Sequence, residues 1–544
     1  MASSGNFCIY NPLPYSTYFR TGLYSNAYNG VTNAGNTCAN PGNACTGFGT
    51  MALTSGKKWY MEGIATNAYT TAMGIFELNN CNTIQNSLNT SYHNNTSYKS
   101  AFYAANGKKY IDGAESSYGA TFAAGDVIGM AVDLESATNT VTFYKNNSSQ
   151  GSFNLGTNGL DYLFCVARPT SSGAFHMNWG QDSTFAGTKT AGGNADANGF
   201  GDFFYSVPSG YLALCSGNLG MSADIDPAEG ANPTQFHDTI IYTGDGGTAT
   251  SITGLNFQPD WVLIKNRDQA DGWLNQNSVS GVGVTHEWND DGPYESETDC
   301  ITAFNSDGFT LSNDHKVNAN TEKYVAYCWK KSADAGFDIV EYSGNGSTNN
   351  VSHSLGATPD CIMMHLKSGS DWDSTMYFNS PSMGTGEGVF MTLANAGQTS
   401  TYVSAVSSST FTPTTSANTS TRTYVAYLFR NIEGFSKFGE FEGNANADGP
   451  FVYTGFRPKF VFFKAIDQSE NWQIRDTARL TFNNGTALRI YWNTNGTEGT
   501  ASTASPIDFL ASGFKIRGSN TEINSNTIIY GAWADVPFKY GNTL

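Results

Sequence analysis

The feature that most constrains this chain is an internal repeat in its C-terminal part. Three stretches open alike, with Phe236-His-Asp-Thr-Ile-Ile-Tyr-Thr-Gly-Asp-Gly, Phe337-Asp-Ile-Val-Glu-Tyr-Ser-Gly-Asn-Gly and Phe435-Ser-Lys-Phe-Gly-Glu-Phe-Glu-Gly-Asn-Ala. Their first residues lie 101 and 98 residues apart. The chain must therefore form three similar units in succession.

Four further landmarks keep the same order and nearly the same spacing in each stretch. They are a proline before an apolar strand (Pro259, Pro359, Pro458), a tryptophan after a polar turn (Trp273, Trp372, Trp472), a later phenylalanine (Phe309, Phe411, Phe514) and a closing aromatic strand (from Tyr324, Tyr424, Ile528). Because the tryptophans recur at matching places, we expect them to pack in the core of each unit.

Short apolar runs bounded by Gly, Asn, Asp or Pro fill each unit, and this pattern is typical of β-strands. No helical apolar period is sustained over more than a few turns. Turns such as Gly244-Asp-Gly-Gly and Ser343-Gly-Asn-Gly favour hairpins over a phosphate cradle, because Gly and Asn tolerate positive φ. We therefore expect an all-β chain in which each repeat is a sandwich or a barrel-like unit.

The N-terminal part also contains strand patterns, but of a different kind. Gly56-Lys-Lys-Trp-Tyr-Met-Glu-Gly enters a strand, Gly125-Asp-Val-Ile-Gly-Met-Ala-Val-Asp-Leu-Glu is a turn with a buried strand, and Asn139-Thr-Val-Thr-Phe-Tyr-Lys-Asn-Asn alternates in polarity before a turn. This succession resembles the SPRY family, which consists of β-sandwich interaction modules. The resemblance covers roughly the first 180 residues and implies recognition through loops, without chemistry of its own.

Three sequence elements carry this resemblance. The matching residues are Trp59, Tyr60 and Glu62 in the first element, residues 125–133 in the second and residues 141–146 in the third. The family's usual hairpin glycine is replaced by Asn147, which tolerates positive φ. A SPRY-like module followed by tandem β repeats is also similar to large structural proteins of tailed, often aquatic, bacteriophages. Coiled-coil heptads and collagen-like triplets are missing here, which puts a long fibre shaft in doubt.

These patterns predict five segments along the chain. The segments are a SPRY-like β-sandwich domain over 1–216, a linker over 217–235 and three β repeats over 236–334, 335–434 and 435–544. No apolar run is long enough to span a membrane, and the N-terminus has no secretory signal pattern, so we expect no membrane insertion.

Charge and cysteine content narrow the function classes. The net charge is −18, which disfavours nucleic acid as a partner, because its binding requires basic residues on phosphates. Nine cysteines without a Cys-x-x-Cys motif argue against a structural zinc site. Four of them should be buried as small apolar residues, namely Cys165, Cys215, Cys328 and Cys361. Cys38 and Cys45 flank a loop and could form a disulfide.

One motif suggests a metal ligand set. Asn194, Asp196 and Asn198 alternate before a glycine, as oxygen ligands do at the start of a calcium loop. The closing glutamate of such a loop is missing, since Tyr205 stands at its position. An Asx-rich turn is the alternative interpretation. Calcium is the one cofactor that we consider, and no other cofactor is indicated.

An acidic insertion in the first repeat holds the remaining candidates. Its carboxylates are Glu287, Asp290, Asp291, Glu295, Glu297 and Asp299, and the other two repeats have no counterpart. They could form a solvated loop, a calcium site or a glycosidase pair. Trp288 and Tyr294, with Asp290 and Asp291, are the residues that we expect to make exposed binding contacts. No nucleophile elbow, P-loop or paired-histidine motif is present, so we expect no enzyme.

The resemblance to structural proteins of tailed bacteriophages implies a bacteriophage virion protein of tail-fibre or adhesin type. It would lie on the virion surface, be made in the host cytoplasm, and recognise a host surface glycan or protein through loops. Other virion proteins are expected partners, and a homo-oligomer, with a trimer favoured, is the expected state. A capsid or tail decoration protein is the first alternative, and a glycan depolymerase is the second.

Overall fold

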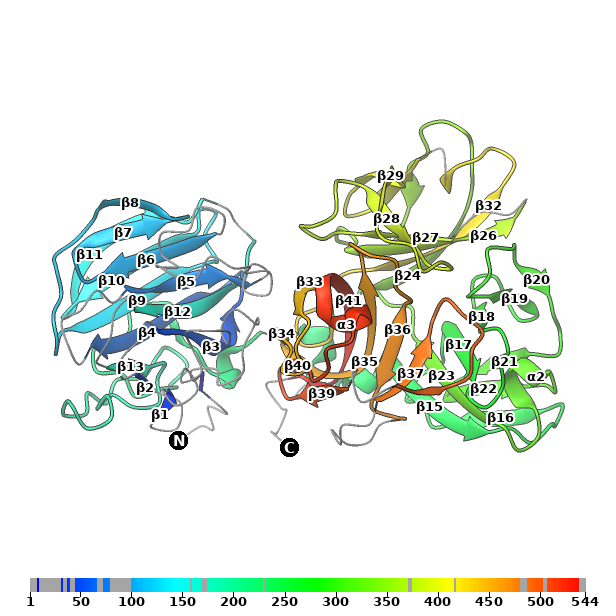
Figure 1. The fold of residues 1–544 in the computed structure, drawn as a ribbon, viewed down its shortest axis with the longest axis horizontal. Helices are drawn as coiled ribbons and strands as arrows, with labels where there is room; N and C mark the ends of the chain where they lie inside the picture. Colours follow the sequence, from blue (N-terminus) through cyan, green and yellow to red (C-terminus); the bar gives the residue numbers. More distant parts are fainter. Residues whose placement is uncertain are drawn as a thin grey trace. The chain divides into compact units, whose positions relative to one another are not determined.

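The computed structural model shows an all-β chain, as the sequence predicts (Figure 1). It describes residues 7–8, 31–32, 37–39, 45–65, 72–78, 99–156, 159–168, 174–220, 222–227, 230–369, 374–414, 417–479, 487–501 and 506–537. Contacts divide the chain into two compact units, the first with residues 1–220 and 450–455, the second with 221–449 and 456–544. Each is described by itself.

Two antiparallel sheets make up the first unit. The larger has the order β1 (Val31–Thr32), β2 (Thr37–Ala39), β13 (Ala174–Asn178), β4 (Lys58–Ala65), β9 (Val127–Asp133), β10 (Thr140–Lys145) and β11 (Ser148–Asn154). The smaller has the order β3 (Cys45–Leu53), β12 (Tyr162–Arg168), β5 (Ala72–Glu77), β6 (Ser100–Ala104), β7 (Lys108–Ile111) and β8 (Ala114–Ser117). Tyr103 on β6 packs against Phe143 on β10, with ring centroids 5.4 Å apart, so the sheets face each other as a sandwich.

The three elements of the SPRY resemblance lie on neighbouring strands, β4, β9 and β10. The turn between β10 and β11 places Asn146 and Asn147 at φ +46° and +67°, as the sequence predicts for Asn147. The outer face of this sheet is covered by the following segment. That segment includes β14 (Leu212–Ala213), which pairs parallel with β4, and Phe203, which lies 5.3 Å from the ring of Tyr60.

Three six-stranded antiparallel sheets form most of the second unit, and all have the same strand order. Sheet 1 is β15 (His237–Thr243), β23 (Lys323–Trp329), β17 (Trp261–Asn266), β18 (Leu274–Asn277), β19 (Val284–Glu287) and β20 (Glu295–Ser296). Sheet 2 is β24 (Phe337–Ser343), β32 (Thr423–Phe429), β26 (Cys361–Ser368), β27 (Thr375–Phe378), β28 (Glu387–Phe390) and β29 (Gln398–Thr401). Sheet 3 is β33 (Ser436–Asn444), β41 (Ser525–Pro537), β35 (Phe456–Ala465), β36 (Gln473–Asp476), β37 (Ala487–Tyr491) and β38 (Gly499–Ala501).

A small sheet accompanies each large one, and three short helices and two helical turns complete the described elements. The small-sheet strands are β16 (Thr250–Thr253), β22 (Gly308–Leu311) and β21 (Ile301–Asn305); β25 (Val351–Ser352), β31 (Thr410–Pro413) and β30 (Val403–Val406); and β40 (Gly513–Ile516) with β39 (Ile507–Leu510). The helical elements are η4 (Ser216–Asn218), η5 (Ala223–Ile225), η7 (Pro233–Gln235), α2 (His315–Asn318) and α3 (Thr521–Asn524), and β34 is Phe451–Tyr453. We call each large sheet with its small sheet a module, numbered 1 to 3, and α2 and α3 belong to modules 1 and 3.

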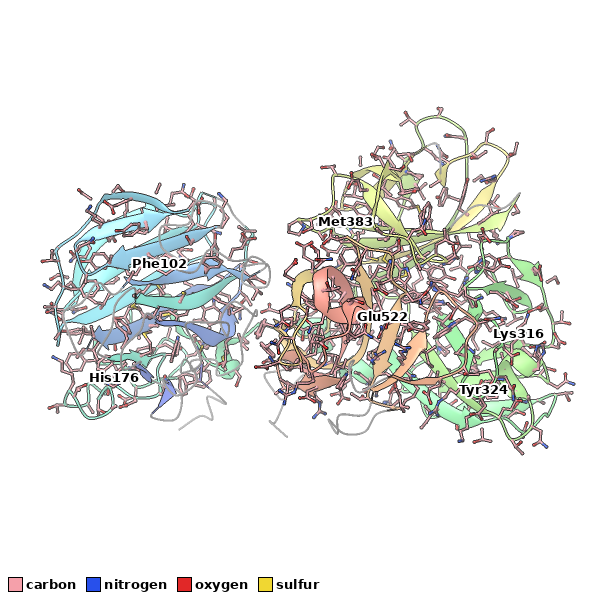
Figure 2. All side chains as sticks on the ribbon, in the orientation of Figure 1. Phe102, His176, Lys316, Tyr324, Met383 and Glu522 are labelled. Carbon is pink, nitrogen blue, oxygen red and sulfur yellow. The ribbon has the colours of Figure 1, made fainter. Side chains whose placement is uncertain are left out.

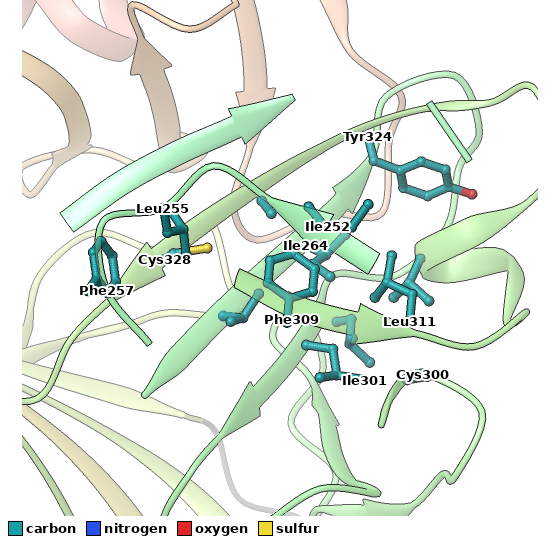
Figure 3. Packing of buried hydrophobic residues seen from close by; sticks show 14 residues of the cluster. Ile252, Leu255, Phe257, Ile264, Cys300, Ile301, Phe309, Leu311, Tyr324 and Cys328 are labelled. Atoms are coloured by element: carbon teal, nitrogen blue, oxygen red, sulfur yellow. The ribbon is translucent and has the colours of Figure 1, made fainter. Parts of the chain in front are cut away.

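Each large sheet has two buried faces. The outer face packs on the small sheet; in module 1, Phe309 and Leu311 of β22 meet Ile264 of β17 and Cys328 of β23 (Figure 3). The phenylalanines that recur in the sequence, Phe309, Phe411 and Phe514, are all fully buried on these small sheets. They therefore fill the core inside each module.

The inner face of each large sheet packs against the other two modules. The closing aromatic strand lies second in each sheet, and its last ring points to a shared centre. These rings are Trp329, Phe429 and Trp533. Trp533 lies 5.6 Å from Trp329 and 5.3 Å from Phe429, between ring centroids. The three modules thus share one aromatic core.

Polar contacts join the modules pairwise and close them into what we call the ring. Between modules 1 and 2, Asn277 Nδ2 donates to Tyr427 Oη (3.0 Å) and Ser280 Oγ to Glu341 Oε1 (2.6 Å). Between modules 2 and 3, Trp472 Nε1 donates to Phe390 O (2.8 Å) and Ser382 Oγ to Glu440 Oε1 (2.8 Å). Between modules 3 and 1, Tyr327 Oη donates to Asp476 Oδ2 (2.8 Å) and Trp273 Nε1 to Tyr491 O (3.0 Å). We call these three contact regions seams.

Strand register corrects part of the sequence alignment. Trp273 and Trp472 occupy matching places and are fully buried, as predicted. In module 2 the register puts Ser374, not a tryptophan, at this place. Trp372 itself lies outside the described residues. The alignment was wrong here because spacing in a polar turn does not fix which residue enters the strand.

The buried cysteines are as predicted, because Cys165, Cys215, Cys328 and Cys361 all have no exposed surface. The predicted pairing of Cys38 with Cys45 falls on side chains outside the described residues. The predicted domain boundaries stay a prediction, although contacts group all three modules into one compact unit.

The repeated Gly-Asp and Gly-Asn turns are not hairpins, which corrects the sequence interpretation. The strands on either side, such as β15 and β16, belong to different sheets. Here the glycine allows close approach of two backbones: a Cβ on Gly344 would lie 2.1 Å from Thr419 O. The neighbouring Asn418 fastens this contact, accepting from Asn345 N (2.9 Å) and donating to Asn345 Oδ1 (2.9 Å).

We expect Gly344→Ala to lower the stability of the ring by roughly 1–3 kcal/mol, because the added methyl group must displace backbone. Gly496→Ala is the matched control, since its Cβ would meet only Thr494 Oγ1, at 3.5 Å. Thermal unfolding of the full chain measures both. Equal melting temperatures for the two variants would contradict the close contact.

Candidate functional site

The acidic insertion of module 1 supplies the strongest concentration of titratable side chains that the sequence singled out. Glu287 ends β19, and Glu297 follows β20. Their carboxylates meet at the ammonium of Lys316 on α2, each with an oxygen 2.9 Å from Nζ. Figure 2 labels Lys316 at this end of the module. The Lys316 side chain is only 14% exposed, whereas Glu287 is 37% exposed, so the ammonium is shielded from water and one carboxylate is not.

A second group adjoins this triad. Asp299, Cys300 and Asp314 each offer a ligand atom, and these atoms lie within 4.8 Å of one another. Asp314 is the N-cap of α2 and accepts from Lys316 N at 2.7 Å. Cys300 Sγ donates to Glu297 Oε2 at 3.6 Å. The thiol and one carboxylate are therefore already used by protein partners.

The surroundings of Glu297, Cys300 and Asp314 shift the pKa of each group. Burial raises the pKa of the Cys300 thiol and of Asp314, which disfavours the charged form of both groups. The pKa of Glu297 is lowered: burial opposes ionisation, but hydrogen bonds from Lys316 and Thr285 outweigh it. An ionised glutamate held on a lysine cannot serve as the general acid of a glycosidase. The arrangement fits an ion-pair network that holds the insertion in place.

The same place in module 3 carries the opposite charge. Glu522 on α3 is equivalent to Lys316 of module 1. Strand register makes Tyr491 equivalent to Glu287. Glu522 accepts from Arg489 Nη1 (2.9 Å) and from Tyr491 Oη (2.6 Å). Sequence reasoning missed Lys316 and Glu522, because the helices that carry them are one turn long and have no apolar period. The modules thus share a framework and differ in the chemistry of this place.

The residues predicted to make exposed binding contacts do not share one surface. Trp288 is fully buried, which corrects the expectation of exposure: it lies 4.1 Å from His365 and 5.2 Å from Trp492, between ring centroids. Tyr294 is half-buried, and its hydroxyl is hydrogen-bonded to Tyr427 Oη of module 2 at 2.8 Å. These aromatic residues join modules. Strand register also gives Trp288 a counterpart in module 3, Trp492, so Trp288 belongs to the repeated framework and not to the insertion.

Asp290 and Asp291 lie on the turn after β19. Asp290 is exposed and Asp291 is half-buried. Asp290 Oδ1 accepts from the backbone N–H of Asp291 at 2.8 Å. Of the four predicted contact residues, these two lie nearest to solvent, and their role in binding stays a prediction.

The predicted calcium ligands lie on the segment that covers the first unit. Asp196 is buried, and its Oδ2 accepts from Ala213 N (2.8 Å) and Asn218 Nδ2 (2.7 Å). Its Oδ1 accepts from the backbone N–H groups of Asn198 and Phe200, both at 2.9 Å. Asn194 Nδ2 donates to Phe203 O at 3.2 Å. Protein donors thus occupy both oxygens of Asp196, and the calcium hypothesis stays a prediction.

A buried carboxylate that carries the SPRY resemblance anchors the same segment. Glu62 on β4 accepts from Phe204 N (2.8 Å) and Tyr205 N (2.9 Å), and Tyr60 Oη donates to it at 3.1 Å. Burial raises its pKa to about 7, although these hydrogen bonds oppose the rise. Glu62 therefore fastens the covering segment to the sheet and is no surface residue.

We expect Lys316→Met to destabilise the ring by roughly 1–3 kcal/mol at pH 7, because two carboxylates then lose their counter-charge. The lowered pKa of Glu297 gives stability above its ordinary value of 4.5 that disappears as the pH falls. The loss caused by the variant should therefore shrink below about pH 4. Thermal unfolding between pH 7 and about pH 3 measures this, with Lys323→Met at an exposed site as control. A loss that stays constant with pH would contradict the ion triad.

We expect Asp196→Ala to lower the stability of the first unit by at least about 2 kcal/mol, since four donors lose their acceptor. Glu135→Ala is the control, because that side chain is 61% exposed. Calorimetry with calcium should give no binding heat on the wild type. A calcium-dependent rise in melting temperature that Asp196→Ala abolishes would show instead that the ion replaces these donors.

Comparison with known proteins finds similar solved structures and one matching family model. A human SPRY domain matches at 18% identity over 27% of this chain and 94% of that chain, with a TM-score of 0.21. The SPRY domain of human HERC1 matches at 19% identity over 27% of this chain and 89% of that chain, with a TM-score of 0.22. Stonustoxin matches at 10% identity over 31% of this chain and 27% of that chain, with a TM-score of 0.23.

No curated protein matches the chain. Among the described residues, no helix has both the length and the apolar character needed to cross a membrane. A family model matches residues 232–537, which include all three modules of the ring and make up more than half of the chain. The chain therefore belongs to the family described as Domain of unknown function (DUF7483).

Proposed function

We propose that the chain is a non-catalytic structural protein on the surface of a bacteriophage particle, of tail-fibre or adhesin type. Its particle context rests on the resemblance of a SPRY-like module with tandem β repeats to phage structural proteins. Its role in recognition rests on the ring. The proposed partners are other virion proteins and a host surface glycan or protein.

One observation carries the proposal: the modules share a framework but differ in the polar side chains at one place, which we call the outer end. In module 1 this place holds Lys316, and in module 3 it holds Glu522. The aromatic centre and the glycine contacts recur in the modules, and the polar group beside the short helix does not. Module 1 has an ammonium between two carboxylates there, and module 3 has a carboxylate on an arginine and a tyrosine. At the matching strand position, module 2 has Phe390. A rigid scaffold with variable ends suits recognition of a surface.

The titratable groups at these ends support binding over catalysis. Glu297 and Glu522 are both engaged by cationic partners at 2.9 Å. Reaction with a glycan would need one carboxyl group that holds its proton and another that is free to act. The depolymerase alternative is therefore the less favoured one.

Location on purified particles tests the proposal. Antibodies against the first unit should label intact particles at the tail, and mass spectrometry should find the chain among virion proteins. Labelling over the capsid shell would favour the decoration alternative. Absence of the chain from particles would contradict both.

Mass photometry and a binding assay refine the same test. A fluorescent full chain should bind host cells and leave host polysaccharide uncut after prolonged incubation. A stable trimer in solution would favour a fibre tip, and a monomer that binds only assembled capsids would favour decoration. Release of oligosaccharides would overturn the non-catalytic assignment.

A further inference from the structure

Four histidines of the ring are buried, and each has one ring nitrogen without a hydrogen-bond partner. One of them, His353, directly follows β25 of the small sheet in module 2. The other three lie on the large sheets, and their unpartnered atoms are His237 Nε2, His286 Nδ1 and His365 Nε2. The opposite nitrogens are bonded to Cys328 O (3.0 Å), Gly292 O (3.0 Å) and Ser374 Oγ (2.8 Å). Among the described residues, no carboxylate hydrogen-bonds these imidazoles. The charged form of these rings therefore gains no hydrogen bond to a carboxylate.

Two of these histidines face each other across the seam between modules 1 and 2. His286 on β19 lies 4.7 Å from His365 on β26, between ring centroids. Trp288 and Tyr294 of module 1 stack on them, at 4.1 Å from His365 and 5.0 Å from His286. From module 2, Tyr427 approaches His365 at 6.2 Å.

Asp290 is the acidic group that acts on this pair, and it interacts with His286 only through space. The two imidazoles also repel each other when charged, which disfavours protonation of His365. Protonation of either ring would therefore place a positive charge in an aromatic seam, and protonation of both would place two.

The third histidine lies at the seam between modules 3 and 1. His237 on β15 packs against Phe460 (5.6 Å) and Trp533 (5.7 Å) of module 3, and stacks on Trp329 of its own module (4.7 Å). The charged group facing it is Lys459, whose ammonium is 2.6 Å from Asp238 Oδ1. A nearby cation makes protonation of His237 harder still.

The seam between modules 2 and 3 is built differently. The contacts described there are Trp472 Nε1 to Phe390 O, Lys464 Nζ to Ala394 O (2.9 Å), Gly397 N to Ile466 O (2.7 Å) and Ser382 to Glu440. None of these described contacts uses a histidine. Module 1 is thus bordered by buried imidazoles on both sides, whereas modules 2 and 3 meet without them.

These histidines do not belong to the repeated framework. Strand register places Val389 and Ile490 at the position of His286, and Phe337 and Ser436 at that of His237. At the position of His365 stand Lys265 and Lys464, whose ammonium groups bond backbone carbonyls. The other modules therefore show which residues the framework tolerates.

We propose that module 1 is an acid-releasable part of the ring: proton uptake by His237, His286 and His365 opens both of its seams, while the seam between modules 2 and 3 stays closed. The proposal does not depend on the virion assignment.

The direction of the effect follows from linkage. Burial lowers the pKa of His286 from 6.5 to about 4 and that of His237 to about 3, and it lowers the pKa of His365 as well. A lowered histidine pKa gives stability that is complete above 6.5 and is lost as the pH falls toward the folded-state value. At pH 5, which lies between 6.5 and the folded-state pKa of His286 of about 4, protonation of His286 alone should shift the equilibrium toward the open seam roughly 30-fold relative to pH 7.5.

Hydrogen–deuterium exchange of the full chain at pH 7.5 and pH 5, corrected for intrinsic rates, tests the proposal. We expect protection in β15, β19 and β23 to fall at least about 30-fold at pH 5, with little change in β28 and β33, which carry Phe390 and Glu440 at the seam between modules 2 and 3. Equal loss in all three modules, or no loss in module 1, would overturn it.

Variants at these three positions separate the histidines from general acid effects, and the substitutions at His237 and His286 copy the residues of another module, Phe337 and Ile490. The triple variant His237→Phe, His286→Ile, His365→Met should keep module 1 protected at pH 5. If it does not fold, the single variants His237→Phe and His286→Ile each report on one seam. His315→Gln is the control, since that side chain is 65% exposed and should leave the loss intact. Variants that lose protection at pH 5 as the wild type does would refute the role of these residues.

Discussion

The contact on which the second unit depends is the meeting of Trp329, Phe429 and Trp533 at its centre. Each ring is the last aromatic residue of the strand that lies second in its sheet, with strands hydrogen-bonded on both sides. Burying these large rings removes roughly several hundred Å² of apolar surface from water. Each Å² of apolar surface buried stabilises the folded state by on the order of 25 cal/mol. A single module would expose this aromatic face to water. The folded state of each module is therefore stabilised by its contact with the other two.

Once the inner faces are buried, the polar groups on them must find partners within the ring. Arg479 illustrates this: it is almost fully buried, and its guanidinium binds Asp476 at 2.6 Å and Glu498 at 2.8 Å. Glu498 also holds Arg267 of module 1 at 2.8 Å. Such buried pairs add little net stability, but removing one partner is costly. They therefore fix which modules meet, while the aromatic centre supplies the stabilisation.

Much of the fold could be predicted from the sequence, because strand patterning and repetition are local signals. The all-β class, the buried Trp273 and Trp472 and the turn at Asn147 are confirmed. The arrangement of the modules could not be predicted, since a strand buried on both faces has the same apolar pattern whether its second face meets a small sheet or another module. The expected exposure of Trp288 failed for this reason.

The candidate site was harder to predict than the fold. Glu287 and Glu297 were singled out as acidic residues of one insertion, but Lys316, which joins them, is separated from both in sequence. Ion pairs between distant segments leave no periodic signal. The acceptor role of Asp196 was hidden likewise, since backbone N–H groups of every residue type look alike in a sequence.

The closure of three modules within one polypeptide has an evolutionary consequence. In a ring made of three identical chains, every substitution appears three times, so a change that suits one face is forced on the other two. Here each module is encoded separately, and its outer end can change while the aromatic centre is kept. Lys316 in module 1 and Glu522 in module 3 show this freedom, since opposite charges occupy one position of the same framework. A single copy of the chain can therefore present three chemically distinct faces at fixed mutual positions.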